Sequence, residues 1–268
     1  MGTEFLITGA SGQLGRVLLE LLGKRAVGTD LPELDITDSK SVKDAVERVN
    51  PKWIINCAAL TDVDMCQRKP ELAMSVHRDG VANLVRTGRR LLTISTDHVF
   101  TGKKGQKEPF LEGDETAPCN LYGESKLLGE SEALVDPRNI VIRTSWLYSA
   151  ASGMIPLLWK ALSESGEVPG VIDQVSCLTY APDLAEAVID IIRLGGSGLY
   201  HLVNSPGVTP AEVALRLSEF AGGNVKDITW ADLELDAPRP VYSELATSRG
   251  TDMPAVWNAI ERWRMRNV

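Results

Sequence analysis

Short runs of apolar residues alternate with segments of helical spacing through the first half of the chain. The apolar runs predict buried strands at 5–7, 26–30, 53–57, 91–95 and 140–143. Between these runs, apolar side chains recur every three or four positions, and they predict helices over 14–22, 39–49, 71–89 and 121–134. Strands that alternate with helices form βαβ units, and runs without polar residues are typical of parallel strands covered on both faces.

The second half of the chain has a less regular pattern. Its helical spacing predicts four helices, at 154–162, at 183–194, from Pro210 onward and at 255–264, and an apolar run predicts a late strand at 199–203. Thr209 precedes the third of these helices as an N-cap, with proline at the first helical position. Irregular stretches rich in proline and glycine occupy 147–153, 165–182 and 232–254.

Composition and charge narrow the classes of function. The chain has 268 residues and a net charge of −8, which disfavours a nucleic-acid partner because phosphate backbones require clustered basic residues. It contains no apolar run of about 18 residues, so no membrane association is expected. The four cysteines form no CxxC pair and no metal-ligand spacing, and no targeting segment is recognised, so we expect reduced thiols, a cytoplasmic protein and no bound metal.

A glycine-rich turn follows the first predicted strand and opens the first predicted helix. Residues 8–15 read Thr-Gly-Ala-Ser-Gly-Gln-Leu-Gly, which spaces Gly9, Gly12 and Gly15 as GxxGxxG. Such a turn brings backbone N–H groups and the helix N-terminus against a pyrophosphate. Glycine-rich turns alone are common, but this position between strand and helix is the context of a dinucleotide fingerprint.

The predicted fold class is therefore α/β, a Rossmann-type doubly wound parallel sheet with a small C-terminal substrate-binding lobe. Residues 1–146 are expected to form the dinucleotide-binding domain. Residues 147–268 are expected to be mixed, with the lobe interleaved with late sheet elements at about 181–204.

Asp30 ends the second predicted strand, 21 residues after Gly9. A carboxylate at this place can accept hydrogen bonds from an adenosine ribose and would repel a 2′-phosphate, which favours NADH or dual use over NADPH alone. The alternative is an ordinary turn residue at a strand end. Asp35 and Ile36 are weaker candidates for the border of the adenine.

Tyr122 and Lys126 lie four residues apart and hence on one helical face. An ammonium group nearby would lower the tyrosine pKa, and such a tyrosine could protonate a carbonyl oxygen as hydride reaches the carbon. Thr96, at the end of the fourth strand, could donate a hydrogen bond to the same oxygen. The alternatives are a solvated helix face and a strand-end cap.

Together these motifs resemble the extended short-chain dehydrogenase/reductases, and within them the dTDP-4-dehydrorhamnose reductases. The resemblance covers nearly the whole chain, and its matching stretches are 8–15, 34–38, 56–64, 95–102, 118–126 with Gly129 and Glu130, 142–148, 180–185, 198–201 and 239–243. It implies NAD(P)H-dependent reduction of the C4 ketone of a nucleotide-linked 6-deoxyhexose. Homodimers are common among such enzymes.

The resemblance also implies roles for individual residues. The catalytic residues would be Thr96, Tyr122 and Lys126. The cofactor would be lined by Gly9, Gly12, Gln13, Leu14, Asp30, Asp35, Ile36, Ala58, Ala59 and Thr61, together with Tyr122 and Lys126. The substrate would meet Val63, Thr96, Trp146, Gln174 and Arg239.

The chain departs from the family pattern at several positions. His98 stands where the family usually has Tyr, and His77 where it has Asn. Residues 154–155 and 177–179 also differ, and the loop after Asp30 is short. Alternative functions are therefore a reductase or epimerase of another nucleotide sugar, or a non-catalytic regulatory subunit resembling that of methionine adenosyltransferase.

Overall fold

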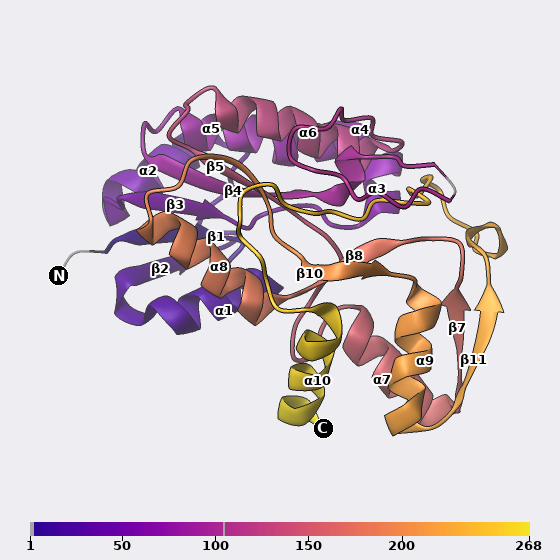
Figure 1. Ribbon diagram of the computed structural model, residues 1–268. Helices are drawn as coiled ribbons and strands as arrows, with labels where there is room; N and C mark the ends of the chain where they lie inside the picture. The colour runs from indigo at the N-terminus through magenta and orange to yellow at the C-terminus, as the bar shows by residue number, and fades with distance from the viewer. Residues whose placement is uncertain (1–2, 104) are drawn as a thin grey trace.

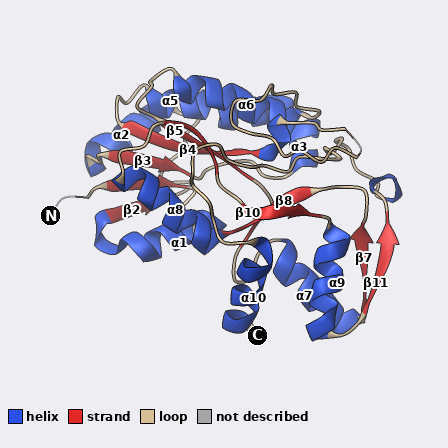
Figure 2. Ribbon diagram, in the orientation of Figure 1, coloured by secondary structure: helices blue, strands red, loops and turns tan. Residues whose placement is uncertain are grey.

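A six-stranded parallel sheet is the central layer of the computed structural model, which describes residues 3–103 and 105–268 (Figures 1 and 2). Its strands are Phe5–Thr8 (β1), Ala26–Thr29 (β2), Trp53–Asn56 (β3), Arg90–Thr96 (β4), Ile140–Thr144 (β5) and Gly198–His201 (β9). Their spatial order is β2-β1-β3-β4-β5-β9. The chain winds outward from β1 to β2 and then returns past β1 to β3. Ligands of doubly wound folds bind at such a reversal, beyond the carboxyl ends of the strands.

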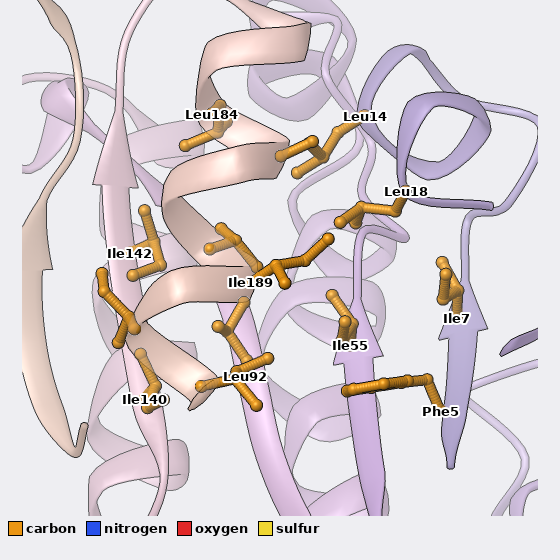
Figure 3. Packing of buried hydrophobic residues seen from close by; sticks show 14 of the residues in the cluster. Phe5, Ile7, Leu14, Leu18, Ile55, Leu92, Ile140, Ile142, Leu184 and Ile189 are labelled. Atoms are coloured by element: carbon orange, nitrogen blue, oxygen red, sulfur yellow. The ribbon is translucent and has the colours of Figure 1, made fainter. Parts of the chain in front are cut away.

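Helices cover both faces of this sheet (Figure 1). One face carries Gln13–Leu22 (α1) and Ala181–Arg193 (α8), and the other carries Ser39–Val49 (α2), Gly80–Val85 (α5) and Leu121–Leu134 (α6). Figure 3 shows Leu14 and Leu18 of α1 and Leu184 and Ile189 of α8 packed over strand side chains such as Ile55. Each fully buried aliphatic side chain contributes roughly 1.5–3 kcal/mol, so this layer holds the strand ends at fixed relative positions. The predicted fold class is confirmed.

The later part of the chain adds two small sheets. Leu147–Tyr148 (β6), Ser176–Tyr180 (β8) and Asn204–Val208 (β10) form one, and Glu167–Val171 (β7) and Asn224–Ile228 (β11) form a parallel pair. Three helices pack with them around a second apolar core: Met154–Ser165 (α7), Pro210–Ala221 (α9) and Val256–Asn267 (α10). The predicted cap of α9 is present, because the Thr209 side chain accepts from the N–H of Glu212, whose carboxylate accepts from the N–H of Thr209.

Some predicted elements were wrong. The helix expected over 71–89 consists of Pro70–Met74 (α4), a π-helical turn at Ser75–Asp79 and α5, and it ends at Val85. The stretch 165–182 is not irregular, since it holds β7 and β8. Pro169 argued against a strand at β7, because proline cannot donate a backbone hydrogen bond to a neighbouring strand. It is tolerated here because β7 is an edge strand that pairs with β11 on one side only. A short helix, Val63–Arg68 (α3), was missed.

No helix within the described residues is both long enough and apolar enough to cross a membrane.

Candidate active site

A cleft of about 790 Å³ opens at the carboxyl ends of β1, β3, β4 and β5. It lies where the strand order reverses, as the ligand rule for this fold requires. The cleft brings together most residues that the sequence singled out: Gly9, Gly12, Gln13, Leu14, Asp30, Asp35, Ile36, Ala58, Ala59, Thr61, Val63, Thr96, Tyr122, Lys126 and Trp146.

The glycine-rich turn forms one wall of this cleft. Gly9 has φ +66°, and a Cβ atom there would lie 2.6 Å from the backbone nitrogen of Ala58. A Cβ at Gly15 would lie 2.4 Å from the Gly9 carbonyl oxygen. Gly12 caps α1 without any side chain over the first N–H groups, so the helix N-terminus faces the cleft uncovered. Such a cradle fits a pyrophosphate, which needs close backbone approach and N–H donors.

Asp30 lies next to this cradle at the end of β2. Its Oδ2 accepts a hydrogen bond from the Ser11 N–H at 2.5 Å, and it lines the cleft together with Asp35. Among the described residues that line the cleft, Lys126 is the only Lys or Arg. The lining of the cleft near Asp30 therefore carries negative charge, while Arg16 lies behind it and donates from Nε to the carbonyl oxygen of Ser11 at 2.6 Å.

Tyr122 and Lys126 project from the first turns of α6 toward the same cleft. The Lys126 Nζ donates to the carbonyl oxygen of Ile94 at 2.5 Å, and burial lowers the pKa of Lys126 to about 8. Burial raises the pKa of Tyr122 above its ordinary value, while the Thr96 hydroxyl opposes this rise. The net shift of the tyrosine pKa is therefore upward, opposite to the expected lowering, because the cost of burying a phenolate dominates.

Thr96 is held by its own neighbours. Its hydroxyl donates to Asp97 Oδ1 at 3.2 Å and accepts from the His98 N–H at 3.2 Å. The other carboxylate oxygen, Asp97 Oδ2, accepts from the hydroxyls of Ser176 (2.7 Å) and Ser243 (2.6 Å). Thr96 was expected to donate to a substrate carbonyl, whereas in this structure its hydroxyl donates to the adjacent carboxylate. Asp97 was missed as a site residue, although its place at the end of a parallel strand was a signal.

Two histidine rings flank Tyr122 edge-on, with centroids 5.6 Å away for His77 and 5.5 Å for His98. The Nε2 atom of His77 accepts from the Leu60 N–H at 3.0 Å, and Nδ1 lies 2.8 Å from the Ser125 hydroxyl. That hydroxyl donates to the Tyr122 carbonyl oxygen. Burial lowers the pKa of His77 to about 2, so this ring is neutral and joins the cleft wall to the first turn of α6.

Residues expected to meet the substrate fall into two groups. Val63 and Trp146 line the cleft. The backbone of Trp146 has φ +30°, which is strained for a bulky residue, and such strain is concentrated at functional sites. Arg239 pairs with Asp64 at 3.1 Å and lines a separate hollow of about 250 Å³. Gln174 is buried and donates to the Pro240 carbonyl oxygen. The structure does not bring these last two side chains to the cleft.

Within residues 3–103 and 105–268, no three His, Cys, Asp or Glu side chains are grouped as a metal site requires. The groups of the cleft instead fit a dinucleotide at the glycine-rich turn and a polar ligand beside Tyr122.

Comparisons with known proteins agree with this geometry. Residues 3–265 match the family described as RmlD substrate binding domain. A dTDP-4-dehydrorhamnose reductase of Streptomyces griseus is 35% identical over 264 residues, 92% of this chain and 86% of the relative. The crystal structure of dTDP-4-dehydrorhamnose reductase from Bacillus anthracis in complex with NADP is 31% identical, with a TM-score of 0.93, over 99% of this chain and 100% of that one. The protein from Clostridium acetobutylicum, another such reductase, is 30% identical with a TM-score of 0.92, over 98% and 99% of the two chains. This chain belongs to the RmlD substrate binding domain family, whose members similar to it include dTDP-4-dehydrorhamnose reductases.

Proposed function

We propose that the protein reduces the C4 ketone of dTDP-4-dehydro-L-rhamnose to give dTDP-L-rhamnose, with NADH or NADPH as the reductant. The observation that carries this proposal is the position of Tyr122. Its phenol lies in one cleft with Thr96 and Lys126, and the same cleft contains the glycine-rich cradle. The relatives described above, which are named as dTDP-4-dehydrorhamnose reductases and match this chain over most of its length, support the same substrate.

The cradle and Asp30 would hold the dinucleotide. The N-terminus of α1 would receive the pyrophosphate, Asp30 the adenosine ribose, and Ala58, Ala59 and Thr61 would form the wall beside it. When bound, the reduced nicotinamide supplies the hydride for the carbonyl carbon.

Tyr122 supplies the proton. Because burial raises its pKa, the phenol keeps its proton at neutral pH until negative charge develops on the substrate oxygen. Lys126, with a pKa near 8, is largely charged at neutral pH and stabilises the phenolate that remains. The hydroxyl of Thr96 acts on the same phenol and opposes the rise of its pKa.

The preference between NADH and NADPH follows from the charge beside the cradle. We infer NADH preference or dual use, because a 2′-phosphate near Asp30 would meet a carboxylate and no basic side chain among the described lining residues. The NADP in the Bacillus anthracis structure supports a nicotinamide cofactor in general.

Cofactor oxidation tests the proposal. A panel of nucleotide-linked keto-sugars is assayed with both reduced nicotinamides, and dTDP-4-dehydro-L-rhamnose should give the highest kcat/KM. Tyr122→Phe should lower kcat/KM by about 10²–10⁴-fold with cofactor binding intact, the range typical of a general acid. Tyr148→Phe is the control, since its buried hydroxyl has no partner among the described residues.

Two results would contradict the proposal. Unchanged turnover in Tyr122→Phe would remove its proton donor. Tight binding to another enzyme, without any sugar-dependent oxidation of the cofactor, would favour the regulatory subunit.

A further inference from the structure

His98 occupies a place in the cleft that the mechanism above does not use. It belongs to the single turn Asp97–Val99 that follows Thr96, and its ring stands at 83° to the ring of Tyr122. The side chain lines the cleft although only 6% of the residue is exposed. Its Nδ1 atom has a protein partner, whereas Nε2 has none within the described part of the chain.

Asn120 determines which nitrogen of His98 carries the proton. Asn120 caps α6, and its Oδ1 accepts from the Gly123 N–H at 2.8 Å. Its Nδ2 therefore faces the other way, and donates to the Pro238 carbonyl oxygen (2.9 Å) and to His98 Nδ1 (3.1 Å). Since Nδ1 must present a lone pair to this donor, the proton of the neutral ring lies on Nε2.

The ring is also held neutral by its surroundings. Burial lowers the pKa of His98. The charged groups that act on it, Asp97 and Arg239, oppose each other, because the carboxylate raises this pKa and the guanidinium lowers it. His98 is therefore a neutral ring that donates a hydrogen bond from Nε2 alone, rather than a cation suited to bind a diphosphate.

We propose that the Nε2–H of His98 donates a hydrogen bond to the hydroxyl beside the reacting carbonyl of the sugar, which makes His98 a specificity-determining residue. This inference rests on the proposed function. The acceptor is the C3 hydroxyl, because the other neighbour of C4 in a 6-deoxyhexose, C5, carries the ring oxygen and the methyl group. A ring 5.5 Å from the proton-donating phenol ring is placed to reach that hydroxyl while Tyr122 reaches the carbonyl oxygen.

Two substrates separate this role from a structural one. On dTDP-4-dehydro-L-rhamnose, His98→Phe should lower kcat/KM about tenfold, as the loss of a neutral hydrogen bond does. On the analogue without the C3 hydroxyl, the same variant should match the wild-type protein. His98→Gln, which returns an N–H donor near the position of Nε2, should recover most of the loss.

Asn120→Asp tests the tautomer. The carboxylate still accepts from the Gly123 N–H and so keeps the helix cap, but it no longer donates to Nδ1. The ring proton should move to Nδ1, and kcat/KM should fall about as far as in His98→Phe. Because the new carboxylate raises the pKa of His98, protonation at lower pH restores an Nε2–H, and activity should recover as the pH falls in this variant alone.

Equal losses of His98→Phe on both substrates, or no loss on either, would overturn the proposal. The tautomer is also read without turnover, from the imidazole nitrogen resonances of ¹⁵N-histidine-labelled protein with and without added dTDP-L-rhamnose. A protonated Nε2 whose resonance shifts with this probe supports His98 even if no keto-sugar is reduced. A protonated Nδ1, or a resonance that does not respond, refutes it, whereas absent cofactor oxidation by the wild-type protein refutes the proposed function.

Discussion

Asp30→Asn should shift cofactor choice toward NADPH. The substitution removes the negative charge near the cradle but keeps an oxygen that can accept the Ser11 N–H, now bonded at 2.5 Å. The local turn should therefore persist, and the change should act through electrostatics alone. The wild-type protein should show a higher kcat/KM with NADH than with NADPH.

The size of the effect follows from the charges that face the 2′-phosphate. Two unit charges 4 Å apart repel by about 1 kcal/mol in water and about 4 kcal/mol at an effective dielectric constant of 20. Asp30 is partly exposed, so we take roughly 2 kcal/mol, which corresponds to about 30-fold in kcat/KM. Among the described lining residues the only basic one, Lys126, lies beside Tyr122. Arg16 does not line the cleft, but its Nε donates to the carbonyl oxygen of Ser11 at 2.6 Å, so it offsets part of this repulsion and about 30-fold is an upper value.

The assay compares kcat/KM for NADH and NADPH at saturating sugar in the wild-type protein and in Asp30→Asn. Asp35→Asn is the matched control, since Asp35 lines the same cleft but its Oδ1 already accepts from the N–H and hydroxyl of Thr37. Its effect on the ratio should be smaller. The wild-type preference should also weaken with added salt, which screens exposed charges. A wild-type preference for NADPH, or an unchanged ratio in Asp30→Asn, would refute the reasoning.

Two further predictions concern stability. Lys126→Met should abolish turnover yet raise the free energy of unfolding at pH 7, because lowering the lysine pKa from 10.5 to about 8 corresponds to roughly 3 kcal/mol. Between about pH 8 and pH 10.5 the folded wild-type protein binds fewer protons than the unfolded chain, so its stability rises with pH. The difference in the free energy of unfolding between the two proteins should therefore shrink. Urea titrations at pH 7 and pH 10 measure this difference, and a larger difference at pH 10 would contradict the prediction. Gly9→Ala should cost more than about 2 kcal/mol and abolish cofactor binding, since it adds a clash with Ala58 to the strain of a positive φ. Gly88→Ala, at φ +70° with open space around it, isolates the strain and should cost only about 1 kcal/mol in the same titration; equal losses in both variants would show that the clash is unimportant.

The local signals in the sequence predicted much of the fold. The run Phe5–Thr8, the glycines after it and the spacing of Leu14 and Leu18 each depend on neighbouring residues, and the structure forms β1, the turn and α1 there. The same holds for α6, whose bounds match the prediction. The strands β7 and β8 were missed, because their stability comes from partners elsewhere in the chain rather than from an alternating pattern.

The environment of the candidate site could be predicted less well from the sequence. The sequence placed Tyr122 and Lys126 on one helical face, but it suggested the wrong direction for the tyrosine pKa. That direction depends on burial, which is the sum of many distant side chains. Asp97 likewise receives hydroxyls from Ser176 and Ser243, which are 79 and 146 positions away.

The sequence by itself determined the alternation of strands and helices in the first half of the chain, the glycine-rich turn and the shared helical face of Tyr122 and Lys126, because these rest on contacts between residues close along the chain. Only the tertiary structure decided the tautomer of His98, the neutrality of His77 and the separation of Arg239 from the cleft. Hydrogen-bond partners and desolvation are properties of three-dimensional neighbours, and the folded chain brings those neighbours together from segments that show no relation in the sequence.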